Sequence, residues 1–126
     1  MYILDSDVII WLLRRKQEIV DAVNNISSHN QTGISTITIA EVYKNMFPEE
    51  TENTELVIEK QQIFVVTSEI ARSAGTYWNK FHKKCLGLSL PDCIIAATAQ
   101  NEKAKLLTLN DRHFPMKDIE IYNPLA

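Results

Sequence analysis

Short apolar runs alternate with stretches of helical periodicity along almost the whole chain. The runs that we predict as strands are residues 2–4, 33–36, 63–66, 105–109 and 119–122. Between them, apolar residues recur three and four positions apart, which is typical of helices that pack one face against a sheet. Strands that alternate with helices indicate a parallel sheet covered on both faces. We therefore predict an α/β fold with three α/β/α layers and a parallel sheet of about five strands.

The chain of 126 residues has the length of one domain, so we expect a single domain over residues 1–126. Apolar residues make up 45% of it and charged residues 23%, which is enough apolar material for a packed core. The predicted helices cover residues 8–13, 17–26, 38–46, 49–60, 68–83 and 92–101.

Nothing in the composition indicates export or membrane insertion. No apolar stretch approaches the roughly 18 residues that a membrane span needs, and the N-terminus lacks the basic start of a signal peptide. The spacing of Cys85 and Cys93 fits no zinc or redox motif. We expect a reduced, cytoplasmic protein with no membrane segment.

Four acidic residues lie at or near the junctions between predicted strands and helices. Asp5 follows the first strand, Glu41 lies in the helix start after the second, and Asp111 lies just past the fourth. Asp92 opens the helix that leads into the fourth strand, so it reaches the same edge only if the preceding loop carries it there. Ligands of open parallel sheets bind beyond the carboxyl ends of the strands. The sequence thus predicts that distant carboxylates converge at one edge.

Each acid also has an ordinary structural explanation when it is taken alone. Asp and Glu are favoured at helix starts, where they accept hydrogen bonds from free N–H groups. The four explanations are an N-cap at Asp5, capping boxes at Thr38–Glu41 and Ser89–Asp92, and turn chemistry at Asn110–Asp111. Caps and catalysis are compatible, because a helix N-terminus favours a nearby anion.

Carboxylates that converge raise one another's pKa unless a cation neutralises them, and Mg²⁺ with oxygen ligands is the common solution. We predict a metal-dependent hydrolysis of a phosphodiester. Asp5 and Asp92 would hold the metal, and Glu41 and Asp111 would bind it directly or through water. Glu41 is the candidate for assisting proton removal from the attacking water.

Basic residues gather in short groups although the net charge is −3. The groups are Arg14–Lys16, Lys80 with Lys83 and Lys84, and Arg112 with His113. Such groups are more often solvated faces than binding sites, but they also suit phosphate. Arg112 and His113 are the candidates for a contact with nucleic acid.

In these residues the chain resembles the PIN-domain ribonucleases, in particular the VapC-type toxins of prokaryotic toxin–antitoxin pairs. The segments that carry the resemblance are Tyr2–Ile9, Ser35–Glu41, Leu88–Ala99 and Leu106–Phe114. The resemblance implies a sheet of strand order 3-2-1-4-5, a Mg²⁺ or Mn²⁺ site and cleavage of RNA. It also implies a cognate antitoxin protein as partner and a homodimer.

Carried over by position, the resemblance makes Asp5, Glu41 and Asp92 the core acids of the metal site. Many relatives place a further acid where Asn110 or His113 stands here. Two alternatives stay open: Asp111 substitutes for that acid, or Asn110 serves as a neutral ligand. The resemblance also implies that Ser6 and Thr108 orient the carboxylates.

Three other functions fit parts of the pattern. The first is a PIN-like module that binds RNA or protein without cleaving it, which the displaced fourth acid would favour. The second is a phospho-receiver domain, but the strand at 63–66 is followed by Thr67 and Ser68 and not by the acceptor Asp. The third is cleavage of DNA, which these residues do not distinguish from cleavage of RNA.

Overall fold

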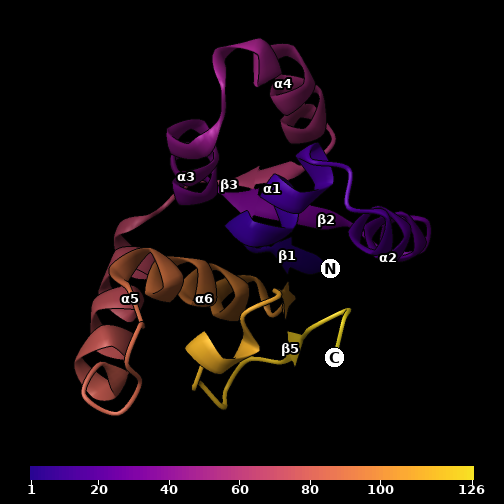
Figure 1. Ribbon diagram of the computed structural model, residues 1–126. Helices are drawn as coiled ribbons and strands as arrows, with labels where there is room; N and C mark the ends of the chain where they lie inside the picture. Colours follow the sequence, from indigo (N-terminus) through magenta and orange to yellow (C-terminus); the bar gives the residue numbers. More distant parts are fainter.

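Five parallel strands form one sheet at the centre of the computed structural model, which describes residues 1–126 (Figure 1). The strands are β1 (Tyr2–Leu4), β2 (Thr32–Ser35), β3 (Gln62–Phe64), β4 (Lys105–Leu107) and β5 (Ile121–Tyr122). Their order is β3-β2-β1-β4-β5, and every neighbouring pair is parallel. The predicted fold class and strand order are confirmed.

Six α-helices connect the strands, and each corresponds to a predicted helix. They are α1 (Ser6–Leu13), α2 (Gln17–Ser27), α3 (Thr36–Asn45), α4 (Thr51–Glu59), α5 (Ser68–Phe81) and α6 (Leu90–Glu102). Two short 3₁₀ helices, η1 (Pro48–Glu50) and η2 (Asp111–His113), lie before α4 and after β4.

The sheet separates two apolar cores. Because side chains alternate along a strand, Ile3 and Leu106 belong to the core under α5 and α6. Leu4 and Leu107 belong to the core under α1 and α2, to which α3 and α4 also contribute. Figure 1 shows α5 and α6 on one side of the strands and α1, α2 and α4 on the other. This arrangement confirms the three layers.

One expected helix start is wrong. We expected a capping box at Thr38–Glu41, but the N-cap is Ser35, whose hydroxyl accepts from the Ile37 N–H at 3.2 Å. The polar residue that ends β2 therefore also begins α3, and no linker separates them. As a consequence, Glu41 lies in the middle of α3, where it has no capping role.

No helix of the structure combines the length and the apolar character that crossing a bilayer requires.

Candidate active site

Asp5 sits at the junction between β1 and α1, and its carboxylate is held from two sides. It is the N-cap of α1, and its Oδ1 accepts from the Ser6 N–H at 2.8 Å. Its Oδ2 accepts from the Thr108 hydroxyl at 2.7 Å. Only 5% of Asp5 is exposed. The Asp5 side chain thus joins the carboxyl ends of β1 and β4. Hydrogen bonds on both of its oxygens fix the orientation of the carboxylate.

Glu41 reaches the same edge from α3. The Ser6 hydroxyl donates to Glu41 Oε1 at 2.5 Å, which links the first turn of α1 to the middle of α3. No donor binds Glu41 Oε2. The hydroxyl groups of Ser6 and Thr108 therefore hold Glu41 and Asp5, respectively, in the structure.

Asp92 lies in the first turn of α6, within the predicted capping box. The Ser89 N–H donates to Asp92 Oδ2 at 3.1 Å, and the Asp92 N–H donates to the Ser89 hydroxyl at 3.2 Å. Pro91 occupies the first turn as expected, since its missing N–H costs nothing there. The charge of Asp92 acts on both Asp5 and Asp7. The loop before α6 therefore does carry Asp92 to the carboxyl edge of the sheet.

Asp7 is a fourth acid at this edge, and the sequence analysis missed it. Its Oδ2 accepts from the Leu109 N–H and from the Asn110 side-chain amide, both at 3.1 Å. Its Oδ1 is buried and has no hydrogen-bond donor. The sequence feature that could have indicated Asp7 is its position two residues after Asp5, in the first turn of the helix that Asp5 caps.

The acids act on one another electrostatically. Burial, followed by the charge of Asp7, raises the pKa of Asp5 to about 8. The hydrogen bonds from Thr108 and Ser6 lower the pKa of Asp5, and the charge of Asp92 adds a smaller increase. Asp5 is thus held in place by donors but destabilised as an anion by its surroundings.

Asp7 shows the same conflict in milder form. Burial raises its pKa to about 6, although the backbone N–H groups of Leu109 and Val8 lower it. The charges of Asp92 and Glu41 also contribute to this raised pKa. Asp5, Asp7, Glu41 and Asp92, hereafter the acidic cluster, are therefore close enough to repel one another.

The other predicted site residues lie at the margin of the acidic cluster. Asp111 is exposed, accepts from the Asn123 amide at 3.0 Å, and does not contribute to the raised pKa of Asp5 or Asp7. Asn110 contacts the cluster as a donor to Asp7. Arg112 is exposed and His113 is half-buried, both in η2. The structure thus brings Asp5, Glu41 and Asp92 together and leaves Asp111 outside.

A divalent cation suits the acidic cluster chemically. All donors are carboxylate oxygens, which Mg²⁺ and Mn²⁺ prefer, and the buried Asp7 Oδ1 lacks any partner. No three acidic, histidine or cysteine side chains stand as a ready set of ligands, however. Glu41 and Asp92 are instead held by Ser6 and Ser89. A cation would compete with those hydrogen bonds and relieve the repulsion among the acids.

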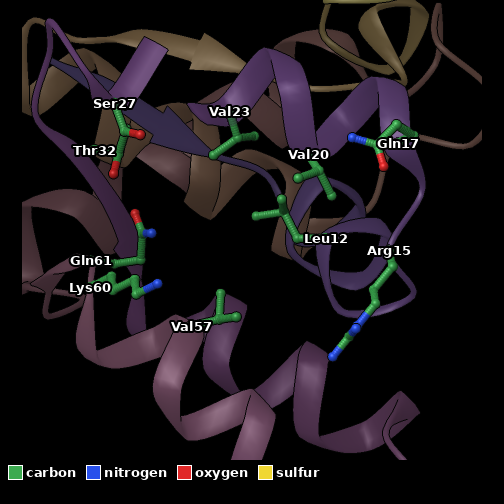
Figure 2. Close-up of a pocket in the computed structure, with 10 residues that line it drawn as sticks. All are labelled: Leu12, Arg15, Gln17, Val20, Val23, Ser27, Thr32, Val57, Lys60 and Gln61. Carbon is green, nitrogen blue, oxygen red and sulfur yellow. The ribbon is translucent and has the colours of Figure 1, made fainter. Parts of the chain in front are cut away.

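The largest cleft lies at the opposite edge of the sheet. It has a volume of about 510 Å³ and is formed by α1, α2 and α4 with the amino ends of β2 and β3 (Figure 2). Its lining residues are Leu12, Arg15, Gln17, Val20, Val23, Ser27, Thr32, Val57, Lys60 and Gln61. None of them belongs to the acidic cluster, so this cleft is a separate feature.

The three-layer fold and the buried acids at the carboxyl edge of its parallel sheet are features that can be compared with those of known protein families. Residues 2–120 match the PIN domain family. The chain therefore belongs to the PIN-domain family.

Within that family the chain is similar to the VapC proteins. It is 31% identical to Ribonuclease VapC10 of Mycobacterium tuberculosis over 116 residues, which cover 92% of this chain and 87% of the relative. It is 26% identical to Ribonuclease VapC1 of Haemophilus influenzae, with 90% of each chain covered.

Solved structures share the fold. A toxin–antitoxin complex from Klebsiella pneumoniae superposes with a TM-score of 0.81 at 24% identity and covers 98% of both chains. VapBC-1 from nontypeable Haemophilus influenzae superposes with a TM-score of 0.80 at 24% identity and covers 99% of this chain and 98% of that chain. At this identity the likeness concerns the fold.

Proposed function

We propose that this protein is a Mg²⁺- or Mn²⁺-dependent endoribonuclease that hydrolyses RNA phosphodiester bonds as the toxin of a toxin–antitoxin pair. The observation that carries the proposal is the convergence of Asp5, Asp7, Glu41 and Asp92 from distant parts of the chain. The similarity to VapC ribonucleases over most of the chain supports RNA as the substrate.

In this proposal Asp5, Asp92 and Asp7 hold the metal, and Glu41 works beside it. When bound, the cation supplies a water of lowered pKa and offsets charge on the phosphate. The Thr108 hydroxyl and the Ser6 N–H orient Asp5 and favour its ionised form, which a bound cation would stabilise further. The Ser6 hydroxyl occupies Glu41 Oε1, so Oε2 is the atom that can accept a proton from the attacking water.

The proposal is tested by incubating the purified chain with single-stranded RNA in Mg²⁺ or Mn²⁺ and sequencing the new ends. We expect cleavage that stops with a chelator and falls at least about 100-fold in Asp92→Asn, since that change removes one carboxylate ligand. Asp111→Asn is the matched control, because Asp111 lies outside the acidic cluster.

Two results would count against this proposal. Asp92→Asn that cleaves at the parent rate would remove Asp92 from the reaction. A folded parent that binds RNA without cutting it would favour the rival function of a binding module.

An antitoxin partner is the second part of the proposal, since the structural neighbours include toxin–antitoxin complexes. The cleft between α1, α2 and α4 suits apolar side chains of such a partner. Leu12, Val20 and Val57 form apolar walls, while Arg15 and Lys60 add positive charge that would favour acidic residues of the partner (Figure 2).

Val57→Glu tests this docking surface, because it places a carboxylate among the apolar walls. We expect the co-expressed antitoxin to be lost on purification while RNA cleavage by the free chain is unchanged. Leu86→Glu, at an exposed position outside the cleft, is the control. An antitoxin that binds Val57→Glu normally would place the docking surface elsewhere. The homodimer implied by the resemblance stays a prediction, which sedimentation velocity tests.

A further inference from the structure

The segment between α5 and α6 is basic in an acidic chain. From Asn79, near the end of α5, to Pro91, in the first turn of α6, there is no Asp or Glu, whereas Lys80 lies at the end of α5 and Lys83 and Lys84 lie in the connecting segment. Lys83 and Lys84 are exposed, and neither forms an ion pair. The only ion pair of the molecule is Lys105 with Glu120. The two lysines are therefore free to bind an anion.

This segment packs against η2, which brings a second basic group beside it. The Cys85 thiol donates to the Arg112 carbonyl at 3.5 Å. Gly87 has φ of +93°, and a Cβ at that position would lie 3.2 Å from His113 Nε2. Glycine is thus required both for the backbone conformation and for the close approach of the His113 ring. We call Lys83, Lys84, Arg112 and His113 the basic rim.

The basic rim adjoins the acidic cluster at two points of the chain. On one side the segment leads directly into Ser89, the N-cap of the helix that carries Asp92. On the other side η2 follows Asn110, whose amide donates to Asp7. Both connections lie at the edge of the sheet where the acids converge.

We propose that the basic rim binds the backbone phosphates of single-stranded RNA next to the bond that is cut. The inference rests on the proposed function and adds the residues that hold the substrate. The acidic cluster repels a polyanion, so affinity has to come from positive charge outside it. Exposed cations on a loop that is fixed by Cys85 and Gly87 supply that charge without entering the cluster.

The test measures binding separately from cleavage. The full chain in EDTA is titrated with a fluorescein-labelled single-stranded oligoribonucleotide at several salt concentrations. Each phosphate contact contributes about 0.7 to the slope of log affinity against log salt for a single strand. Lys83→Gln/Lys84→Gln should therefore make the slope shallower, reducing its magnitude by roughly 1.4.

The control is Lys103→Gln/Lys117→Gln, which removes the same charge before β4 and β5, at positions with no assigned role in binding. We expect the slope of this variant to match that of the parent. Equal losses in both double variants would mean that only net charge matters, which would overturn the proposal. An unchanged slope in Lys83→Gln/Lys84→Gln would overturn it too.

Cleavage kinetics give a second readout. The variant at Lys83 and Lys84 should raise KM and leave kcat unchanged, because the metal-binding acids are intact. Gly87→Ala should act in the same direction, since it pushes His113 and the loop apart. A loss of kcat at constant KM would contradict binding by the rim.

A DNA strand of the same sequence separates the two nucleic acids as partners. Phosphate contacts alone do not distinguish RNA from DNA, so the proposal is supported if the Lys83→Gln/Lys84→Gln change weakens binding of the RNA strand, and it is overturned if the change weakens binding of the DNA strand alone. If the parent binds RNA through the rim but cleaves nothing, the proposed function fails while this inference holds. The two failures are therefore distinguishable.

Discussion

Asp7 differs from the other carboxylates because one of its oxygens is buried without a hydrogen-bond donor. Burial raises its pKa, and the charges of Asp92 and Glu41 add to that effect. Such a residue lowers the stability of the metal-free fold. It becomes favourable only when a cation compensates the charge, which is a common conflict between stability and function.

Asp7→Asn should therefore stabilise the metal-free protein, and more so at pH 8 than at pH 4.5. The folded-state pKa is raised to about 6, so the folded chain binds more protons than the unfolded chain between about pH 4 and that value. The free energy of unfolding of the parent consequently falls as pH rises through this window. Asp7→Asn has no carboxyl group at this position, so its free energy of unfolding does not fall for this reason. We expect a gain of about 1–3 kcal/mol at pH 8.

Urea unfolding in EDTA at the two pH values measures this gain. In excess Mn²⁺ the parent should be more stable than Asp7→Asn, since the parent binds the metal more tightly and gains more stability from it. A variant that is equally stabilised at both pH values, or that keeps the full Mn²⁺ effect, would show that Asp7 has no part in the site.

Thr108 acts on Asp5 through one hydroxyl. Thr108→Ala removes the donor to Asp5 Oδ2, and we expect kcat to fall about 10- to 100-fold, as for other groups that orient metal ligands. Since this hydrogen bond lowers the pKa of Asp5, its loss should also shift the rising limb of the pH–rate profile to higher pH. Thr108→Ser should restore both, because it keeps the hydroxyl. A parent-like profile for Thr108→Ala would contradict this role.

At the scale of elements, α6 is the helix whose two ends matter most. Its start carries Asp92 in a capping box with Ser89. Its end is Lys103, which has left-handed φ and ψ of 53° and 38°. A side chain with a Cβ is strained there, whereas glycine is not.

Lys103→Gly should raise the free energy of unfolding by about 1 kcal/mol, because it relieves this strain. Glu102→Gly, inside the last turn, should lower it by a similar amount, about 1 kcal/mol. Thermal unfolding of both variants measures the contrast. Destabilisation by Lys103→Gly would mean that the side chain of Lys103 contributes more than the strain costs.

Elements were predictable from sequence because their signals are local. The alternation of apolar runs and helical spacing located every strand and every α-helix, and the capping box at Ser89–Asp92 is as expected. The start of α3 was placed too late, since Ser35 both ends β2 and caps the helix, and two overlapping polar signals compete there.

For the whole molecule, the site was only partly predictable. Asp5, Glu41 and Asp92 could be proposed as a group because strand ends share one edge of a parallel sheet. Asp7 was missed because its role depends on Leu109 and Asn110, a contact of more than 100 positions in sequence separation. Asp111 was proposed because it follows β4 closely in sequence, but it begins η2 and its side chain accepts from the Asn123 amide, a contact that the local sequence does not reveal.

The proposed reaction requires that Asp5, Asp7, Glu41 and Asp92 form one cation site. Crystals grown with Mn²⁺ and measured at the manganese absorption edge test this most directly. We predict an anomalous peak within coordination distance of Asp5 and Asp92 oxygens in the parent, and its loss in Asp92→Asn. A well-ordered parent crystal with no manganese at these carboxylates, or with manganese held only by Asp111, would contradict the account.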